Sequence, residues 1–169
     1  ICGLQMFKNN AKSDAIRILK NGAELGNIKA IRSMGILLKR GKCIRKDLKT
    51  AALYLTEAAN AGDHKAMYHL AKMYLAGEYF QKDERKAFEL FYAASDTVIN
   101  AAIAVINLKV RGIGCDKDPE AAYSIAETIS MKGSHKAKRI LGIMKENGIG
   151  TEKDTVKAAL YFKEASEHD

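Results

Sequence analysis

The residues that most often perform chemistry in proteins are few in this sequence and do not form a recognisable set. The histidines are His64, His69, His135 and His168, and none lies in an H-E-x-x-H motif or near a C-x-x-C pair that would hold a metal ion. No serine lies in the G-x-S-x-G pattern of a nucleophile elbow. The sequence therefore predicts no catalytic residue, no metal ligand and no cofactor, and it argues against an enzyme.

The cysteines, Cys2, Cys43 and Cys115, do not form the framework of a disulfide-stabilised protein. Cys43 and Cys115 fall in equivalent loops two repeats apart, too far to bridge in a stacked array. We therefore expect free thiols, and the cysteines leave the compartment open.

The elements that position all other side chains are set by a repeat of 35 or 36 residues. Two series mark it, the glycines Gly41, Gly77, Gly112 and Gly148 and the aspartates Asp47, Asp83, Asp118 and Asp154. Two series of alanines keep the same spacing, Ala30, Ala66, Ala101 and Ala137, and Ala51, Ala87, Ala122 and Ala158. Each glycine is suited to end one helix and each aspartate to cap the next, with Pro119 at the first helical position after Asp118. The pattern predicts stacked helix pairs.

The repeat marks also set the expected boundaries. We expect helices near 12–25, 28–40, 47–61, 64–76, 83–95, 98–111, 118–132, 135–147 and 154–167. The repeats would span 1–27 (partial), 28–63, 64–97, 98–134 and 135–169 of a single α-solenoid domain. Ile1 to Lys8 would be a helix tail and a loop. We therefore expect a lost upstream segment or export signal, which favours a periplasmic or exported location slightly over the cytoplasm. The junction from Ser95 to Val98 lacks the expected glycine, so its bend should differ.

The repeat resembles the Sel1-like repeat, a relative of the tetratricopeptide repeat. The second repeat matches the family's pattern at Ala66, Leu70, Ala71, Tyr74, Gly77, Asp83, Lys86, Ala87, Phe91 and Ala94. The resemblance implies an all-α fold, a right-handed superhelical α/α solenoid of about four and a half helix pairs, and an adaptor role in protein assemblies. The family's first-helix Tyr is replaced by Leu38, Lys109 and Lys145, and Ile106 stands where a small residue is expected. The third repeat should therefore be the loosest match.

Basic residues give the strongest functional signal. In related solenoids the first helix of each repeat lines a concave groove, and twenty positions at fixed offsets from the repeat's alanine hold nine Lys and Arg against one acid, Glu146. That balance equals the net charge of the chain, +8. The predicted partner-binding residues are Lys29, Arg32, Ile36, Lys39, Arg40, Lys65, Tyr68, Lys72, Leu75, Ile103, Asn107, Arg111, Lys136, Arg139 and Ile143.

Clustered positive charge of this kind favours an acidic protein partner, with the apolar groove residues supplying buried contact. The alternatives are lysines that merely solvate helix faces, and an immunity protein that binds and neutralises a secreted bacterial effector enzyme. Nucleic acid is disfavoured, because Tyr68 is the only aromatic residue among the groove positions. No apolar run approaches a membrane span, although an anionic membrane surface stays open as a partner.

Overall fold

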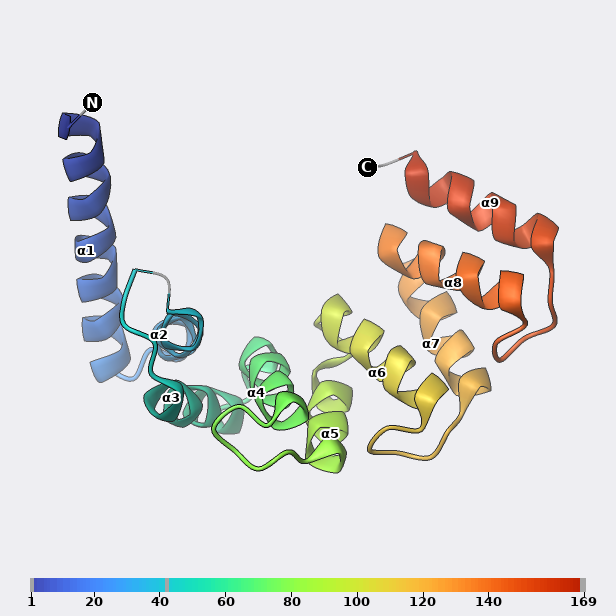
Figure 1. Ribbon diagram of the computed structural model, residues 1–169, viewed down its shortest axis with the longest axis horizontal. Coiled ribbons are helices and arrows are strands. Elements are labelled where there is room, and N and C mark those ends of the chain that lie inside the picture. Colours follow the sequence, from blue (N-terminus) through green and yellow to red (C-terminus); the bar gives the residue numbers. More distant parts are fainter. Residues whose placement is uncertain (1, 42, 168–169) are drawn as a thin grey trace. The chain divides into compact units, whose positions relative to one another are not determined.

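The structure, a computed structural model, describes residues 2–41 and 43–167, with side chains from Ser13 onward. Within these residues it is all-α (Figure 1). The helices are α1 (Cys2–Glu24), α2 (Ile28–Arg40), α3 (Leu48–Asn60), α4 (His64–Ala76), α5 (Glu84–Ala94), α6 (Ile99–Arg111), α7 (Pro119–Met131), α8 (His135–Asn147) and α9 (Thr155–Ser166). None of the helices in these ranges is both long and apolar enough to cross a membrane.

The chain divides into two compact units, residues 1–82 with α1 to α4 and residues 83–169 with α5 to α9. In the N-terminal unit α1 packs on α2, α2 on α3 and α3 on α4, and α2 also contacts α4. In the C-terminal unit each helix from α5 to α9 packs on the next, as Figure 1 shows. Helices packed in consecutive pairs confirm the predicted all-α solenoid fold.

The helix ends follow the repeat marks. Each marker aspartate caps the second helix of its repeat, because a side-chain oxygen accepts a hydrogen bond from the backbone N–H three residues on. Each marker glycine ends the first helix in the left-handed conformation, with φ of 66°, 68°, 70° and 67°. Pro119 is the first residue of α7. The predicted caps are therefore confirmed, and α2 to α9 begin and end within one residue of the predicted bounds.

The first helix is longer than predicted. We expected a helix tail and a loop over Ile1 to Lys8 and a new helix from residue 12, whereas α1 is continuous from Cys2 to Glu24. The positions equivalent to the marker glycine and the marker aspartate are Gln5 and Ala11. Neither residue ends or starts a helix, so the helix continues through the place where the other repeats have a loop.

Alanines and size-matched pairs make the helices fit closely. The marker alanines of α2 to α9 are at most 8% exposed. A Cβ added at Gly35 would lie 2.8 Å from Leu55 Cγ, and one added at Gly142 would lie 2.6 Å from Phe162 Cε1. The third repeat inverts this size pattern, with buried Ile106 and Ala126 in one core cluster at the equivalent positions. The large Ile106 is thus offset by a small residue on the facing helix.

The first-helix position at which the family has Tyr contacts the following loop or helix cap in the second, third and fourth repeats. Tyr74 stacks on Phe80 of the following loop, with ring centroids 4.3 Å apart. Lys109 Nζ lies 3.3 Å from Asp118 Oδ2, and Lys145 Nζ donates to Thr151 Oγ1 at 2.6 Å. The lysines therefore replace an aromatic contact with polar ones that serve the same purpose.

The junction before α6 differs from the others, as the missing glycine predicts. Gly26, Gly62 and Gly133 have positive φ at the equivalent junctions, whereas no residue from Ser95 to Val98 has positive φ. Val98 then occupies the N-cap of α6 without a side-chain hydrogen bond.

Candidate functional site, a basic face on α2 and α4

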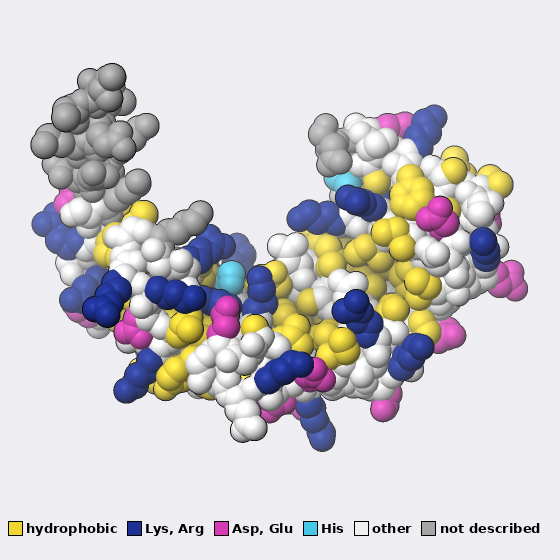
Figure 2. All heavy atoms as spheres, in the orientation of Figure 1, with side chains coloured by type: hydrophobic (Ala, Val, Ile, Leu, Met, Phe, Trp, Pro, Cys, Tyr) yellow, Lys and Arg dark blue, Asp and Glu magenta, His cyan; other side chains and the backbone are white. Residues whose placement is uncertain are grey.

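The strongest candidate site is a group of cations on two neighbouring first helices of the N-terminal unit. We call it the basic face, and it consists of Lys29, Arg32, Lys39 and Arg40 of α2 and Lys65 and Lys72 of α4. Figure 2 shows Lys and Arg side chains gathered over these helices, with a histidine side chain among them. The predicted apolar residues Ile36, Tyr68 and Leu75 lie on the same two helices and are half-buried.

Two of these cations are already neutralised within the protein. Arg32 Nη1 lies 2.5 Å from Asp63 Oδ2, and the two side chains are only 18% and 11% exposed. Lys39 Nζ lies 3.0 Å from Glu78 Oε2. The count of charges at the predicted groove positions did not include Asp63 and Glu78, because these acids lie just beyond the two ends of α4. Arg32 and Lys39 therefore link α2 to the residues that flank α4, and their charges are balanced by these acids.

The other four cations of the basic face have no such partner. Among the residues that the structure describes, no acidic side chain lies within 4 Å of Lys29, Arg40, Lys65 or Lys72. Lys72 instead lies over the ring of Tyr68, with its Nζ 5.9 Å from the ring centroid. These four side chains are exposed and supply the available positive charge.

His69 lies within the basic face and was not among the predicted site residues. It is half-buried on α4, and the ring of Tyr68 contacts it edge-on with centroids 5.2 Å apart. The pKa of His69 is lowered from the usual 6.5 to about 4, mainly by burial and then by the positive charges of Lys39, Arg40, Lys72 and Arg32 in that order. The imidazole is therefore neutral near pH 7. The sequence feature that could have indicated His69 as a site residue is its position on the first helix, three residues after Ala66 and between Lys65 and Lys72.

The excess charge of the chain belongs to the N-terminal unit. Residues 1–82 hold 15 Lys and Arg against 6 Asp and Glu, whereas residues 83–169 hold 13 against 14. The basic face is thus part of a strongly basic unit, and the C-terminal unit is almost neutral.

The remaining predicted residues lie on α6 and α8 of the C-terminal unit. They are Ile103, Asn107, Arg111, Lys136, Arg139 and Ile143, and all are exposed or half-buried. Lys136 and Arg139 line a cavity of about 370 Å³ beside Phe162 and Ser166. Figure 2 shows hydrophobic side chains over α6 to α8, so this unit presents a surface of a different character.

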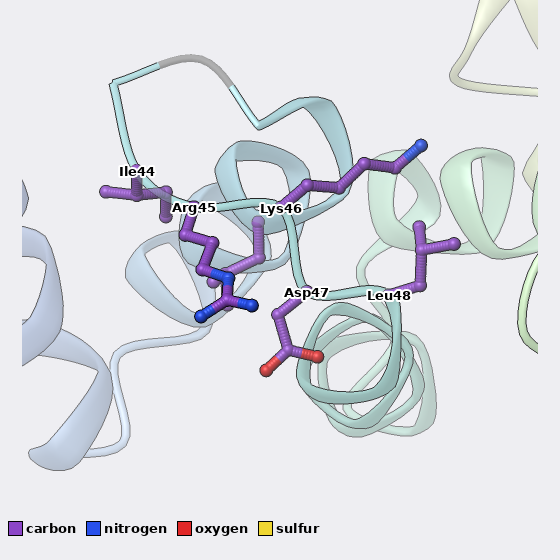
Figure 3. Close-up of a pocket in the computed structure, with 6 residues that line it drawn as sticks. Ile44, Arg45, Lys46, Asp47 and Leu48 are labelled. Atoms are coloured by element: carbon purple, nitrogen blue, oxygen red, sulfur yellow. The ribbon is translucent and has the colours of Figure 1, made fainter.

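A larger cavity, of about 950 Å³, lies at the loop between α2 and α3 (Figure 3). Its lining combines three apolar residues with Arg45, Lys46 and Asp47. Asp47 is engaged as the N-cap of α3, and Figure 3 shows Lys46 pointing away from Arg45 and Asp47. No pair of groups suited to acid–base chemistry converges there.

The described residues contain no group of three His, Cys, Asp or Glu side chains that could hold a metal ion. Cys43 is an exposed free thiol, and Cys115 is a half-buried one whose pKa is raised by burial. His168 and the side chain of Cys2 lie outside the described part of the chain.

These features define a helical repeat protein with a basic face on two of its first helices. The Sel1 repeat family matches residues 28–63, 64–96, 107–134 and 135–169, so the chain belongs to this family. Repeats of this kind generally mediate protein–protein interactions and are typically non-catalytic. The unmatched residues 97–106 include Val98, which lacks a capping side chain, and Ile106.

Known proteins with similar sequences and structures include bacterial and fungal examples. The chitin synthase regulator SKT5 of Saccharomyces cerevisiae is 29% identical over 113 residues, which are 64% of this chain and 16% of that protein. Antigen c5321 of uropathogenic Escherichia coli has a TM-score of 0.84 at 25% identity over 90% of this chain and 33% of that one. A Sel1 repeat protein of Oxalobacter formigenes has a TM-score of 0.82 at 25% identity over 98% of this chain and 69% of that one.

Proposed function

We propose that this protein is a non-catalytic interaction scaffold that holds an acidic protein segment on the basic face of its N-terminal unit. The observation that supports it best is the set of four exposed cations on α2 and α4 that have no acidic partner within the described part of the chain. The family's general role in protein–protein interaction agrees with this proposal. So does the yeast relative, whose name describes a regulator of another protein.

The spacing of the cations suggests the length of the segment. Lys29 and Arg40 lie at opposite ends of α2, eleven residues apart, which is about 16 Å along a helix at 1.5 Å per residue. An extended segment of about five residues covers that distance at roughly 3.3 Å per residue. Ile36 and Leu75 lie on the same two helices and would pack against its apolar side chains.

The same surface is poorly suited to nucleic acid. Sequence-tolerant binding of single strands depends on aromatic rings that stack with bases. The ring of Tyr68 already has Lys72 over it and makes a T-shaped contact with the ring of His69. A protein carboxylate needs no stacking surface, so the contacts favour an acidic peptide.

The test uses a fluorescein-labelled octaglutamate peptide and two matched charge reversals. The first variant changes Arg40, Lys65 and Lys72 to Glu, and the second changes Arg111, Lys136 and Arg139 of the C-terminal unit to Glu. We expect the first to weaken binding by at least about tenfold, because close pairs across an interface are worth on the order of a kcal/mol each. The second should change the affinity by less than about twofold.

Arg32 and Lys39 are left unchanged in this test, since reversing either would place two negative charges together and destabilise α4. Octaglutamine with the same label is the control for charge. Equal losses in the two reversal variants would contradict a site on the basic face.

A further inference from the structure

His69 lies about one helical turn from both Lys65 and Lys72 on α4, and its ring contacts the ring of Tyr68. The charges of Arg32, Lys39 and Arg40 on α2 and of Lys72 on its own helix all act on its ring. The side chains that α3 buries in this unit are all apolar, so they add no charge beside the ring. The nearby acids Asp63 and Glu78 are engaged by Arg32 and Lys39. The charge of Arg40 and Lys72 therefore remains uncompensated.

We propose that His69, together with Arg40 and Lys72, is the point where the basic face holds one carboxylate of the acidic segment, and that binding brings a proton to the imidazole. This inference rests on the proposed function and names the chemistry at the centre of that site. A carboxylate supplies the acceptor and the negative charge that this group of donors lacks. The edge contact with Tyr68 holds the imidazole plane in place.

The proton follows from the electrostatics of the site. In the free protein, burial and four positive charges hold the pKa of His69 at about 4, so the ring is neutral. A bound carboxylate opposes those charges and favours the protonated ring, which raises the pKa toward the usual 6.5. Because the bound state then takes up a proton, affinity must increase as the pH falls from neutral. Burial still opposes protonation after binding, so the rise in pKa is partial.

The size of the effect depends on how far binding raises the pKa of His69. If binding raised the pKa all the way to 6.5, affinity at pH 5.5 would exceed that at pH 7.5 by about tenfold. A partial rise gives a severalfold gain. The peptide's own carboxylates titrate near 4.3, and their protonation would lower the affinity as the pH falls. A higher affinity at lower pH therefore cannot come from the peptide.

The experiment measures octaglutamate affinity at pH 7.5, 6.5 and 5.5 at constant ionic strength, for the wild type, His69→Gln and His64→Gln. Glutamine keeps a hydrogen-bond donor but does not titrate, and His64 is a second histidine on α4. We expect the wild type and His64→Gln to bind severalfold more tightly at pH 5.5, and His69→Gln to lose that gain. The pKa of His69 is also followed by NMR in the wild type, where it should rise when the peptide is present.

The outcomes separate this inference from the proposed function. Binding that depends on Arg40, Lys65 and Lys72 but is no tighter at pH 5.5, or a pH gain that survives in His69→Gln, overturns the role of His69 alone. Failure of the wild type to bind octaglutamate at every pH overturns both proposals. If His69→Gln does not fold, the NMR titration decides, and an unchanged pKa with bound peptide overturns the inference.

Discussion

Single residues in the loops show how closely neighbouring repeats approach. The second residue after each marker glycine has positive φ in every repeat: 73° at Cys43, 69° at Tyr79, 70° at Gly114 and 64° at Gly150. A Cβ built at Gly114 would overlap the carbonyl oxygen of Glu84, and one at Gly150 would overlap that of Pro119. Two constraints therefore act on these glycines, the left-handed backbone and the contact with the preceding repeat.

We predict that Gly150→Ala destabilises the protein by about 2–5 kcal/mol, from about 1–2 for the left-handed conformation and about 1–3 for the overlap. The matched control is Gly133→Ala, where φ is 85° but nothing lies within 4 Å of the added Cβ. That variant should lose only about 1–2 kcal/mol. Urea denaturation measures both values, and equal losses would show that the contact with Pro119 does not constrain the loop.

Residue-scale contacts are also where prediction from the sequence fell short. The positions of Arg32 and Lys39 on the predicted face followed from helical spacing. Their partners, Asp63 and Glu78, lie just outside the first helices. Whether such residues pair depends on which side chains come close in the folded structure, and helical spacing does not show this. The environment of His69 was missed for a related reason, since it depends on cations from the neighbouring helix.

At the scale of single helices, prediction was accurate wherever a cap residue was present. A capping side chain before a helix and a glycine after one determine its ends through backbone hydrogen bonds, and α2 to α9 were located within one residue, including α6, which lacks a capping side chain. The N-terminal helix was mispredicted because Gln5 and Ala11 replace those signals. The pairing of a large Ile106 with a small Ala126 was only partly predictable. The sequence showed that Ile106 is larger than its counterparts in other repeats, but it did not show that Ala126 packs near it.

The caps predict an acid-dependent loss of stability. The hydroxyl of Thr50 donates to Asp47 and is the main cause of that carboxyl's lowered pKa, with the Thr50 backbone N–H second. A carboxyl whose pKa is lower in the folded state stabilises the protein above its unfolded pKa, near 3.8, and loses this effect as the pH falls through the folded value. Asp47 therefore favours folding at neutral pH and ceases to do so in acid.

Asp47→Asn is the test, because asparagine caps a helix about as well but does not titrate. The difference in unfolding midpoint between the wild type and this variant should shrink as the pH is lowered from about 5 to below 3. Urea denaturation at a series of pH values measures it. A difference that stays constant would mean that the charge of Asp47 does not contribute through its cap.

At the scale of the whole molecule, the period of the marker residues was sufficient to predict a solenoid, because stacked helix pairs require the same caps and small residues in each copy. The charge was less well located. The sequence analysis assigned the positive charge to the first helices of all four repeats, whereas the excess of Lys and Arg over Asp and Glu lies in the unit that contains α1 to α4. How the chain divides into compact units depends on packing that no sequence period shows.

The most direct measurement of the central claim maps the bound peptide on the protein. Backbone and histidine NMR signals are followed while unlabelled octaglutamate is added at low salt. We predict that the largest shifts fall on α2 and α4, at Lys29, Arg40, Lys65, His69 and Lys72, and that α6 and α8 change little. Shifts concentrated on α5 to α9, or spread evenly over the surface lysines of both units, would contradict a specific acidic-segment site on the basic face.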